Sequence, residues 1–496
     1  MKKSLLIIPG VIVLAGAGWL GATAWAGKTA QETLEKQHKM LADLPYFVVK
    51  KHNYQSGLFT SHERTTLALN PNLWRPYAEM LKLAGREIPE LEFTYTQEIK
   101  HGPFPLIGKG DFTPLKAVVK TEFVFSPEAN KWLTKLFGQQ KPLEIENRIR
   151  FKEDGEFNIK VPGFTYEETI GKATWQGFDA KIVYGADFNS VDIEAKAPGI
   201  KLDAGTHGSG EIRNITFVTH NQRGASGIML GDGKLSLEAA QFELKDEHKI
   251  SAKLSGLTYV VKSAAQGDFI NSAATVDLTK LELNDKTYGP AKLAVEANHL
   301  HAPTLAKLNK SVNALQKQQY KDAAELNTKM FDVVKAEGLP LLRNDPALAL
   351  RQLSVKLPEG EVSLRADVAM KGFVDADISE PLKLINKLTA KADLTVPKKV
   401  IETLVLMKAR SQIATDTADG QQPDTTELDQ LARNLMENQI KKLAEQKLIQ
   451  VDGESLITSA SWKDGKLTVN GTEFPLPWQT PPDAGGEADI KPALVQ

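Results

Sequence analysis

The chain has 496 residues, 42% of them hydrophobic and 25% charged, which is the composition of a globular protein long enough for two or three domains. Its formal net charge of −1 removes electrostatic attraction to nucleic acid as a default function. It has no cysteine, which excludes disulfides, thiol nucleophiles and thiolate-bound metals and suits an oxidising compartment.

An uncharged stretch opens the chain. Lys2 and Lys3 precede the 22 residues from Leu5 to Ala26, which is enough for a helix to cross about 30 Å of hydrocarbon. Because lysines before a span stay on the cytoplasmic side, we expect residues 1–4 in the cytoplasm and a transmembrane anchor at 5–26. The expected location is the bacterial inner membrane, crossed once, with the bulk of the chain on the periplasmic side.

The same stretch has a second interpretation. Ala24-Trp25-Ala26 and Ala22-Thr23-Ala24 both fit the cleavage pattern of a signal peptide, although the apolar run is longer than such peptides usually have. Under both interpretations, the remainder of the chain is exported across the membrane. We favour a retained anchor.

A β-rich region follows a short helical stalk. Residues 27–43 predict a polar helix that prolongs the anchor and ends at Pro45. Residues 48–69 indicate two strands, and short alternating runs from about residue 91 to 299 predict an antiparallel sheet. One helix interrupts it, with Ser126 as N-cap, Pro127 at the first helical position and Gly138 as the stop. We expect its apolar side chains to pack on the sheet, namely Trp132, Leu133, Leu136 and Phe137.

The last third of the chain mixes helices and strands. Residues 302–337 predict one helix whose two apolar stripes share a face, with Gln316 to Gln319 as the place for a bend and Gly338 and Pro340 as its end. Strands follow, with a hairpin turn at Pro358-Glu359-Gly360. A helical pair is predicted at 397–413 and 425–446, the second begun by a capping-box-like Asp424 and Glu427. Asp464-Gly465 predicts a terminal hairpin.

These elements define the expected fold class as α+β, mainly antiparallel β. A single N-terminal transmembrane helix leads into a large elongated β-rich periplasmic body with a long helix and a C-terminal helical pair. The expected boundaries are 27–301 for the first β-rich region, 302–340 for the helical segment, 341–476 for a second β/α region with the terminal hairpin, and 477–496 for a disordered tail.

No motif for catalysis, phosphate binding or metal binding is present. His299 and His301 could face one side of a strand, but nothing in the sequence completes a metal site, and we interpret them as surface residues. His101 stands in a rigid His-Gly-Pro-Phe-Pro turn and is interpreted as a structural histidine bonded to backbone, with Phe104 in the core. The carboxylate pairs Glu144/Glu146 and Asp154/Glu156 are expected on the solvent face. We therefore predict no catalytic residue, no cofactor and no metal.

Three short motifs, with the lysine-led span, resemble the YdgA-like family of bacterial inner-membrane proteins, a domain of unknown function. The first is Tyr54-x-x-Gly57-x-Phe59-x-Ser61, which has Ser56 and Thr60 where the family usually has Arg and Ser. The second and most distinctive is His101-Gly102-Pro103-Phe104-Pro105, and the third is Asp464 to Gly471, with Gly465, Asn470 and Gly471. The resemblance implies an inner-membrane anchor with a periplasmic body and allows self-association. It implies no reaction, so no catalytic residue is carried over.

Three functions fit these features. The favoured one is a non-enzymatic envelope protein that binds the membrane through its N-terminal helix and holds phospholipid, envelope proteins or a second copy of itself. Its more specific form is an apolar groove for lipid chains, by analogy with AsmA-like envelope proteins. The alternatives are a periplasmic hydrolase using His101 or scattered carboxylates, and a structural homodimer. No binding to nucleic acid is expected.

Overall fold

The computed structural model describes residues 7–70, 72, 92–245, 249–318, 320, 322–416 and 425–475, without the side chains of residues 7–18, 381, 411–416 and 425. The chain divides into two compact units. Unit 1 comprises residues 1–288 and 300–341, and unit 2 comprises residues 289–299 and 342–496. The predicted tail at 477–496 and the capping residue Asp424 lie outside the described residues.

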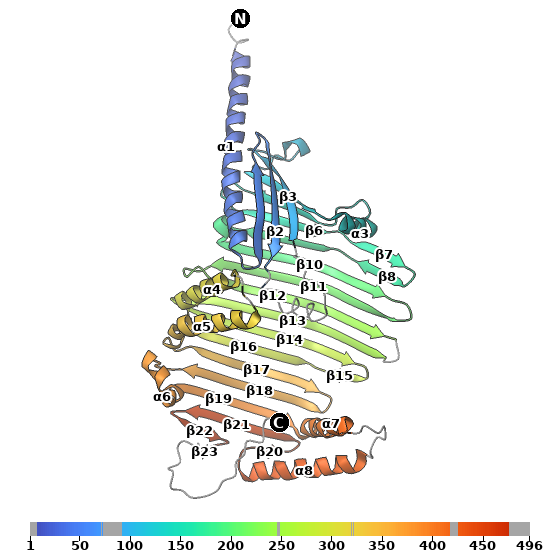
Figure 1. Cartoon of the computed structure of the whole chain (residues 1–496), viewed down its shortest axis with the longest axis vertical. Helices are drawn as coiled ribbons and strands as arrows, with labels where there is room; N and C mark the ends of the chain where they lie inside the picture. The colour runs from blue at the N-terminus through green and yellow to red at the C-terminus, as the bar shows by residue number, and fades with distance from the viewer. Residues whose placement is uncertain are drawn as a thin grey trace. The chain divides into compact units, whose positions relative to one another are not determined.

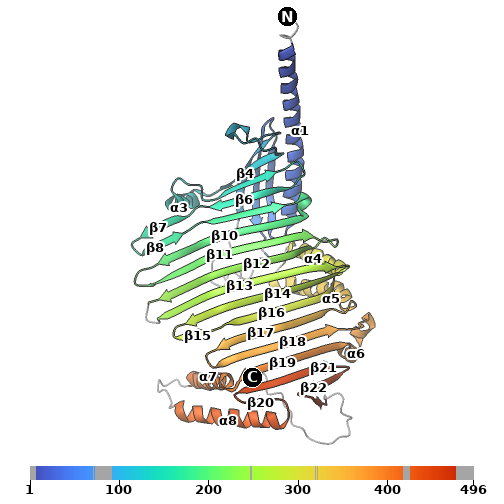
Figure 2. The ribbon, with the colours of Figure 1, turned by 180° about the vertical axis from the view of Figure 1, so that it is seen from behind.

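Unit 1 is built on antiparallel strands, as the alternating sequence predicts. Their bounds are β1 (Phe47–Gln55), β2 (Thr60–Leu69), β3 (Glu92–His101), β4 (Ala117–Val124), β5 (Glu144–Ile149), β6 (Gly155–Val161), β7 (Phe164–Glu168), β8 (Gly171–Trp175), β9 (Phe178–Tyr184), β10 (Ser190–Asp203), β11 (Gly208–Arg223), β12 (Met229–Leu244), β13 (Ile250–Gln266), β14 (Phe269–Leu283) and β15 (Lys286–Tyr288). Strands β1 to β6 pair in sequence order, β6 pairs with β9, and β9 to β15 again pair in order (Figure 2). The β7–β8 hairpin joins β10 through β8.

The N-terminal helix α1 (Ile7–Asp43) is continuous from the described part of the predicted anchor through the predicted stalk. It runs beside β1 to β3 and continues beyond the ends of these strands (Figure 1). The stalk prediction is wrong in one respect, because Ala26, Ala30 and Leu34 are almost fully buried. Their spacing of four residues puts them on one face of the helix, which therefore packs on the sheet. Among the side chains that the structure describes, no helix combines the length and the apolar character needed to cross a membrane.

The short helix α3 (Pro127–Phe137) has the predicted ends. Ser126 Oγ accepts a hydrogen bond from the Ala129 N–H at 3.1 Å, and Gly138 closes the helix. Phe137 packs edge-to-face on Phe164 of β7, with ring centroids 5.2 Å apart. The packing prediction is wrong for Trp132, which is 57% exposed.

The predicted helix over 302–337 is two helices, α4 (Ala302–Gln316) and α5 (Ala323–Leu342). The break lies at the polar stretch where a bend was predicted, so the two apolar stripes do not share one straight helix. The prediction that Gly338 and Pro340 end the second helix is also wrong, because α5 continues to Leu342.

Unit 2 carries a second antiparallel group of strands. These are β16 (Ala291–His301, with residues up to 299 in this unit), β17 (Ala347–Leu357), β18 (Gly360–Met370), β19 (Leu388–Pro397), β20 (Gln450–Asp452), β21 (Ser455–Lys463), β22 (Lys466–Val469) and β23 (Thr472–Phe474). Strand β21 pairs with β19, β20 and β22. The helices are α6 (Pro381–Asn386), α7 (Lys398–Asp416) and α8 (Thr425–Glu445).

The predicted helical pair is confirmed, since α7 and α8 are in contact. Arg433 Nε donates to Glu402 Oε1 at 2.6 Å, and Arg410 pairs with Asp429. Both predicted hairpins are confirmed as well. Lys463 pairs with Lys466 across Asp464-Gly465, and Leu357 pairs with Gly360.

Candidate functional site

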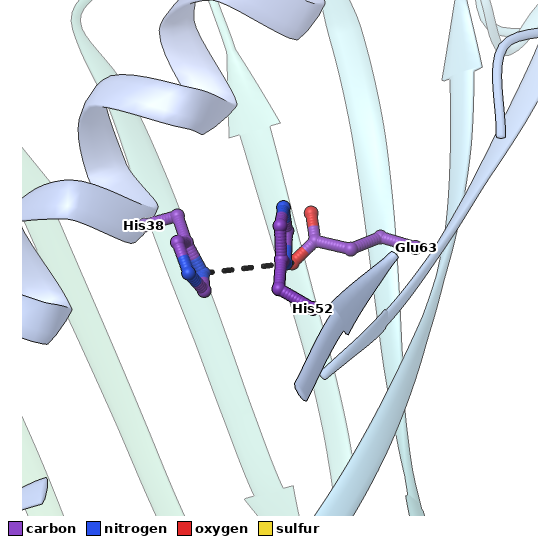
Figure 3. A group of neighbouring side chains, drawn as sticks. All are labelled: His38, His52 and Glu63. Carbon is purple, nitrogen blue, oxygen red and sulfur yellow. Dashed lines mark ion pairs between the residues drawn. The ribbon is translucent and has the colours of Figure 1, made fainter. Parts of the chain in front are cut away.

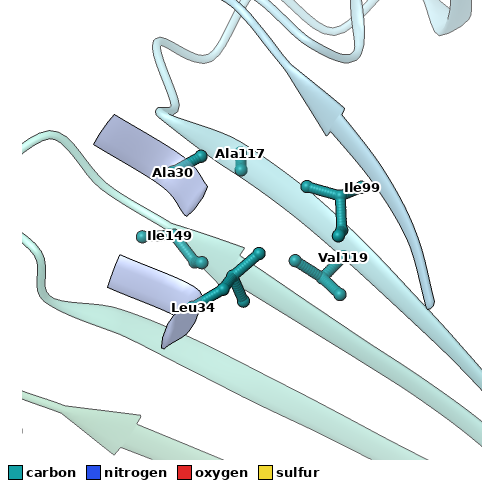
Figure 4. Close-up of a cluster of buried hydrophobic side chains, with 6 residues drawn as sticks. All are labelled: Ala30, Leu34, Ile99, Ala117, Val119 and Ile149. Atoms are coloured by element: carbon teal, nitrogen blue, oxygen red, sulfur yellow. The ribbon is translucent and has the colours of Figure 1, made fainter. Parts of the chain in front are cut away.

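Helix α1 docks on the sheet through small and branched apolar side chains. Ala30 and Leu34 form a buried cluster with four residues of β3, β4 and β5 (Figure 4), namely Ile99, Ala117, Val119 and Ile149. Four of these six side chains share one face of β3, β4 and β5, and the other face carries charged residues such as Glu98, Lys120 and Arg148, with Val118 as an apolar exception. The pattern of period two therefore fixes which side of the sheet receives the helix.

A network of hydrogen bonds and ion pairs also joins the side of α1 to the sheet. Lys116 is 3% exposed, and its Nζ donates to Thr33 Oγ1 at 3.1 Å and lies 3.3 Å from Glu153 Oε1. Glu153 Oε2 also lies 2.9 Å from Lys36 Nζ. The hydrogen bond from Lys36 is the main cause that lowers the pKa of the Glu153 carboxyl. A buried ammonium thus has its counterion at the junction of α1 and the sheet.

His101 lies beneath α1, at the end of β3. It is 4% exposed, and its Nε2 lies 3.2 Å from Ser61 Oγ, which in turn accepts from the Gly57 N–H at 3.3 Å. A Cβ on Gly27 would lie 2.5 Å from the imidazole, so only glycine lets the helix approach His101 this closely. Burial lowers the pKa of the imidazole. The site is a packing contact between helix and sheet, with the imidazole closed off from solvent.

The other predicted motif residues of unit 1 surround this contact. Tyr54 packs against the buried cluster, and a Cβ on Gly57 would lie 2.1 Å from the Thr60 carbonyl oxygen. Phe59 is 48% exposed. Gly102 is buried against Thr23, with a φ of 136°.

The Pro103-Phe104-Pro105 turn projects toward the helix. Phe104 does not sit in the core as predicted, because its ring stacks on Trp19 of α1 with centroids 5.8 Å apart. Trp25 stacks on Phe151 in the same way at 5.9 Å. Several apolar side chains at this end of unit 1 are exposed to between 38% and 65%, namely Leu20, Trp25, Ile107, Phe112 and Phe151.

The remaining motif residues lie in unit 2 and shape its terminal hairpin. Gly465 and Gly471 have positive φ values of 75° and 80°. The Asn470 side chain accepts from the Ser459 N–H at 2.9 Å and donates to the Lys447 carbonyl at 3.0 Å. These roles are conformational and involve no reactive group.

An apolar cavity of about 570 Å³ lies between α1 and the sheet. Leu34, Met40 and Leu41 line it from the helix, and the sheet contributes an aromatic and aliphatic wall, including Phe47, Phe93, Phe123, Phe157 and Ile182. Its few polar groups include His38 and Glu63. A cavity of this size and lining suits a hydrocarbon chain better than a polar substrate.

The wall of the cavity continues as one row of apolar side chains across the sheet. Each member is the register partner of the next, and all lie on the face that α1 covers at one end; we call this the apolar row, consisting of Ile145, Ile159, Ala180, Ala195, Phe217, Leu235, Tyr259 and Val276. Leu235 and Tyr259 are each 41% exposed, so the row is open there. The opposite face carries charged residues over the same strands, including Glu146, Lys160, Lys181 and Lys196.

Two histidines and a glutamate meet at the edge of the cavity (Figure 3). His38 comes from α1, one turn after Leu34, while His52 of β1 and Glu63 of β2 share a face because His52 pairs with Thr65 and Tyr54 with Glu63. Glu63 Oε1 lies 3.4 Å from His52 Nδ1 and 3.9 Å from His38 Nδ1. The two imidazoles stack with centroids 3.9 Å apart. Burial raises the pKa of Glu63 and lowers that of His38.

The histidines and carboxylates weighed from the sequence have ordinary partners. His301 Nδ1 lies 2.7 Å from Thr304 Oγ1 at the start of α4, and His299 Nδ1 lies 2.5 Å from the Asn344 carbonyl oxygen in unit 2. Glu146 pairs with Arg148 at 2.8 Å, and Asp154 pairs with Arg150 at 3.0 Å. None of the four belongs to a metal-ligating cluster among the described residues.

Sequence reasoning missed the His38, His52 and Glu63 group. His38 lies in the predicted polar helix over residues 27–43, and the other two lie 11 residues apart on the two predicted strands of residues 48–69 (63 − 52). Only a hairpin register centred between Leu58 and Phe59, which pairs His52 with Thr65 and Tyr54 with Glu63, puts His52 and Glu63 on one face. Nothing in the sequence brings α1 over that hairpin.

Acidification should weaken the docking of His101. An imidazole whose pKa is lowered on folding stabilises the fold above its unfolded pKa, near 6.5, and that contribution is lost as the pH falls from there toward the lowered value. We expect His101→Gln to have a smaller loss of unfolding free energy between pH 7 and pH 5 than the parent chain. Urea titrations at the two pH values measure it. His62→Gln, on the exposed face of β2, is the control, and an unchanged pH dependence in His101→Gln would contradict this role.

Comparisons with known proteins give one family and one relative. The model of a bacterial protein family of unknown function, DUF945, matches residues 1–477. The chain is 25% identical to Protein YdgA of Escherichia coli (strain K12) over 514 residues, covering 96% of this chain and 95% of that protein. No solved structure matches.

Proposed function

The chain belongs to DUF945, a bacterial family of unknown function, and from that premise we propose that it is a non-enzymatic, membrane-anchored periplasmic protein that holds a lipid chain on its sheet. The observation that carries this proposal is the apolar cavity under α1 together with the apolar row that leads away from it. The bound group is a phospholipid acyl chain.

The open part of the row supports an elongated apolar ligand. A monomeric soluble sheet normally turns polar side chains to water, yet Leu235 and Tyr259 stand side by side in register and remain about two-fifths exposed. Burying both against a hydrocarbon chain would gain roughly 25 cal/mol per Å² of apolar surface removed from water. The opposite face of the sheet is charged over β5 to β10, so only the face with the apolar row would gain free energy by covering a hydrocarbon chain.

The proposed anchor rests on the uncharged residues 5–26 and on the apolar side chains around the exit of α1. Aromatic residues favour the interface between hydrocarbon and water, and Trp19, Trp25, Phe104 and Phe112 are grouped at the end of unit 1 from which α1 projects. Thr23 and Ala26 are buried against unit 1, so in this proposal the membrane surface is at the level of these aromatic rings and only the part of residues 5–26 that precedes them lies in the bilayer. The periplasmic body would then rest on the bilayer, and the cavity, lined by Leu34 to Leu44, would lie about 14–28 Å farther along α1 from the membrane surface.

The test is native mass spectrometry of the full chain, purified in detergent from bacterial membranes. We expect a phospholipid-sized adduct on the parent protein and at least a tenfold lower occupancy in Leu235→Asp, which puts a charge in the apolar row. Val218→Asp is the matched control, because Val218 is similarly exposed at 38% but lies on the opposite face. An adduct that is absent from the parent, or equal in both variants, would contradict the proposal.

A further inference from the structure

In the group of His38, His52 and Glu63, a buried carboxylate and a buried ring nitrogen have fewer hydrogen-bond partners than they can bind. The Glu63 side chain is only 4% exposed, and it accepts one hydrogen bond, from Thr65 Oγ1 at 2.9 Å. The Nδ1 of His38 is buried and makes no hydrogen bond within the described part of the chain. A buried carboxylate whose ion-pair partners are imidazoles 3.4 Å and 3.9 Å away, next to a ring nitrogen that makes no hydrogen bond, is costly unless a further group binds between them.

The arrangement of the donors matches that of a small divalent cation. The three candidate ligand atoms, one from each residue, lie within 4.8 Å of one another. Donors around a tetrahedral Zn²⁺, bound at about 2.0–2.2 Å, are themselves about 3.3 Å apart. The spacings of 3.4 Å and 3.9 Å from Glu63 would shorten by well under an ångström, and the two imidazoles, now stacked with centroids 3.9 Å apart, would turn so that one nitrogen of each faces the ion.

We propose that His38, His52 and Glu63 bind a divalent transition-metal ion, with Zn²⁺ as the preferred occupant. Two imidazoles and one carboxylate are a ligand set typical of zinc sites that keep an open position. The Thr65 hydroxyl, which donates to Glu63 at 2.9 Å, orients the carboxylate from behind, and its contact with His52 Nδ1 at 2.9 Å gives way when that nitrogen binds the ion. No cysteine competes for the ion.

The position of the site gives the ion two roles. It joins α1 to the β1–β2 hairpin, so binding stabilises the docked helix. His38 and Glu63 also line the apolar cavity, whereas His52 does not. The open coordination position is therefore on the cavity side, where it takes a water molecule or an anionic oxygen.

The experiment is a titration of the metal-stripped full chain in detergent with ZnCl₂ by calorimetry, and with CoCl₂ by absorption spectroscopy. We expect one equivalent of Zn²⁺ per chain and visible Co²⁺ bands of a four-coordinate site, with at least 100-fold weaker binding in His52→Ala. His52 is exposed on the hairpin, so its removal leaves the core intact, and a circular dichroism spectrum checks this. His62→Ala is the matched control, since it removes a neighbouring histidine from the opposite face of β2.

Each outcome decides the proposal. Loss of zinc binding in His52→Ala and Glu63→Gln, with retention in His62→Ala, supports it. Absence of stoichiometric binding by the parent chain overturns it, as does equal binding by parent and His52→Ala. A zinc-dependent rise in the melting temperature of the parent, absent from His52→Ala, would confirm that the ion joins helix to hairpin.

Discussion

Replacing Ala30 by Glu should lower the free energy of unfolding of unit 1 by about 4 kcal/mol, the largest effect we expect from a single substitution. Ala30 is fully buried between α1 and the sheet, where Ile99, Ala117 and Ile149 leave neither volume nor hydrogen-bond donors for a carboxylate. The helix must either leave the sheet or bury a charge without a partner. Urea titration of the detergent-solubilised chain, followed by circular dichroism, measures the loss.

Gln31→Glu is the matched control for this substitution. It introduces the same carboxylate one position along the helix, on a flank that is partly open to water. We expect a change below about 0.5 kcal/mol there. Equal stability of the two variants would mean that the α1 contact does not contribute to folding.

The second large effect should come from Glu153→Gln, which we expect to destabilise unit 1 by about 2 kcal/mol. Lys116 is 3% exposed, and the substitution removes its counterion while the ammonium stays buried. A fully buried pair would lose more, but Glu153 is 31% exposed, so water can replace part of the interaction.

The partner substitution should behave differently, because a buried pair is costly to break but cheap to replace. Lys116→Met keeps the apolar stem and removes the buried charge, and we expect it to change stability by less than about 1 kcal/mol. The double variant should be more stable than Glu153→Gln alone. A double-mutant cycle by urea unfolding measures the coupling, and strictly additive single effects would refute the pairing.

Features set by neighbouring residues could be predicted from the sequence. The Ser126 cap, the Asp464-Gly465 turn and the alternating strands each depend on a few adjacent positions, and all are as expected. The break between α4 and α5 shows the limit of this reasoning. The apolar residues before and after Gln316 to Gln319 keep the same helical spacing, which predicted one face of one helix. Spacing alone cannot show that the backbone stays helical between the two stripes.

The candidate sites depend on distant contacts and were not predictable. The stripe of Ala26, Ala30 and Leu34 identifies an apolar face but not the surface that covers it. The same is true of the apolar row, whose members come from eight strands and align only through the register of every pair between them. Gly27 was predicted only as the first residue of the polar helix, whereas in the structure a side chain at this position would collide with the His101 ring.

The docking of α1 has a consequence for the order of folding. Leu34 contacts Ile149, 115 residues later in the chain (149 − 34), whereas β11 to β14 pair with their immediate successors across short turns. Contacts between distant residues close large loops and form slowly, whereas neighbouring hairpins form quickly. The first helix to be synthesised is therefore among the last elements to reach its place. Until β5 has formed, its apolar stripe has no partner in the protein, and the cavity that it covers does not exist.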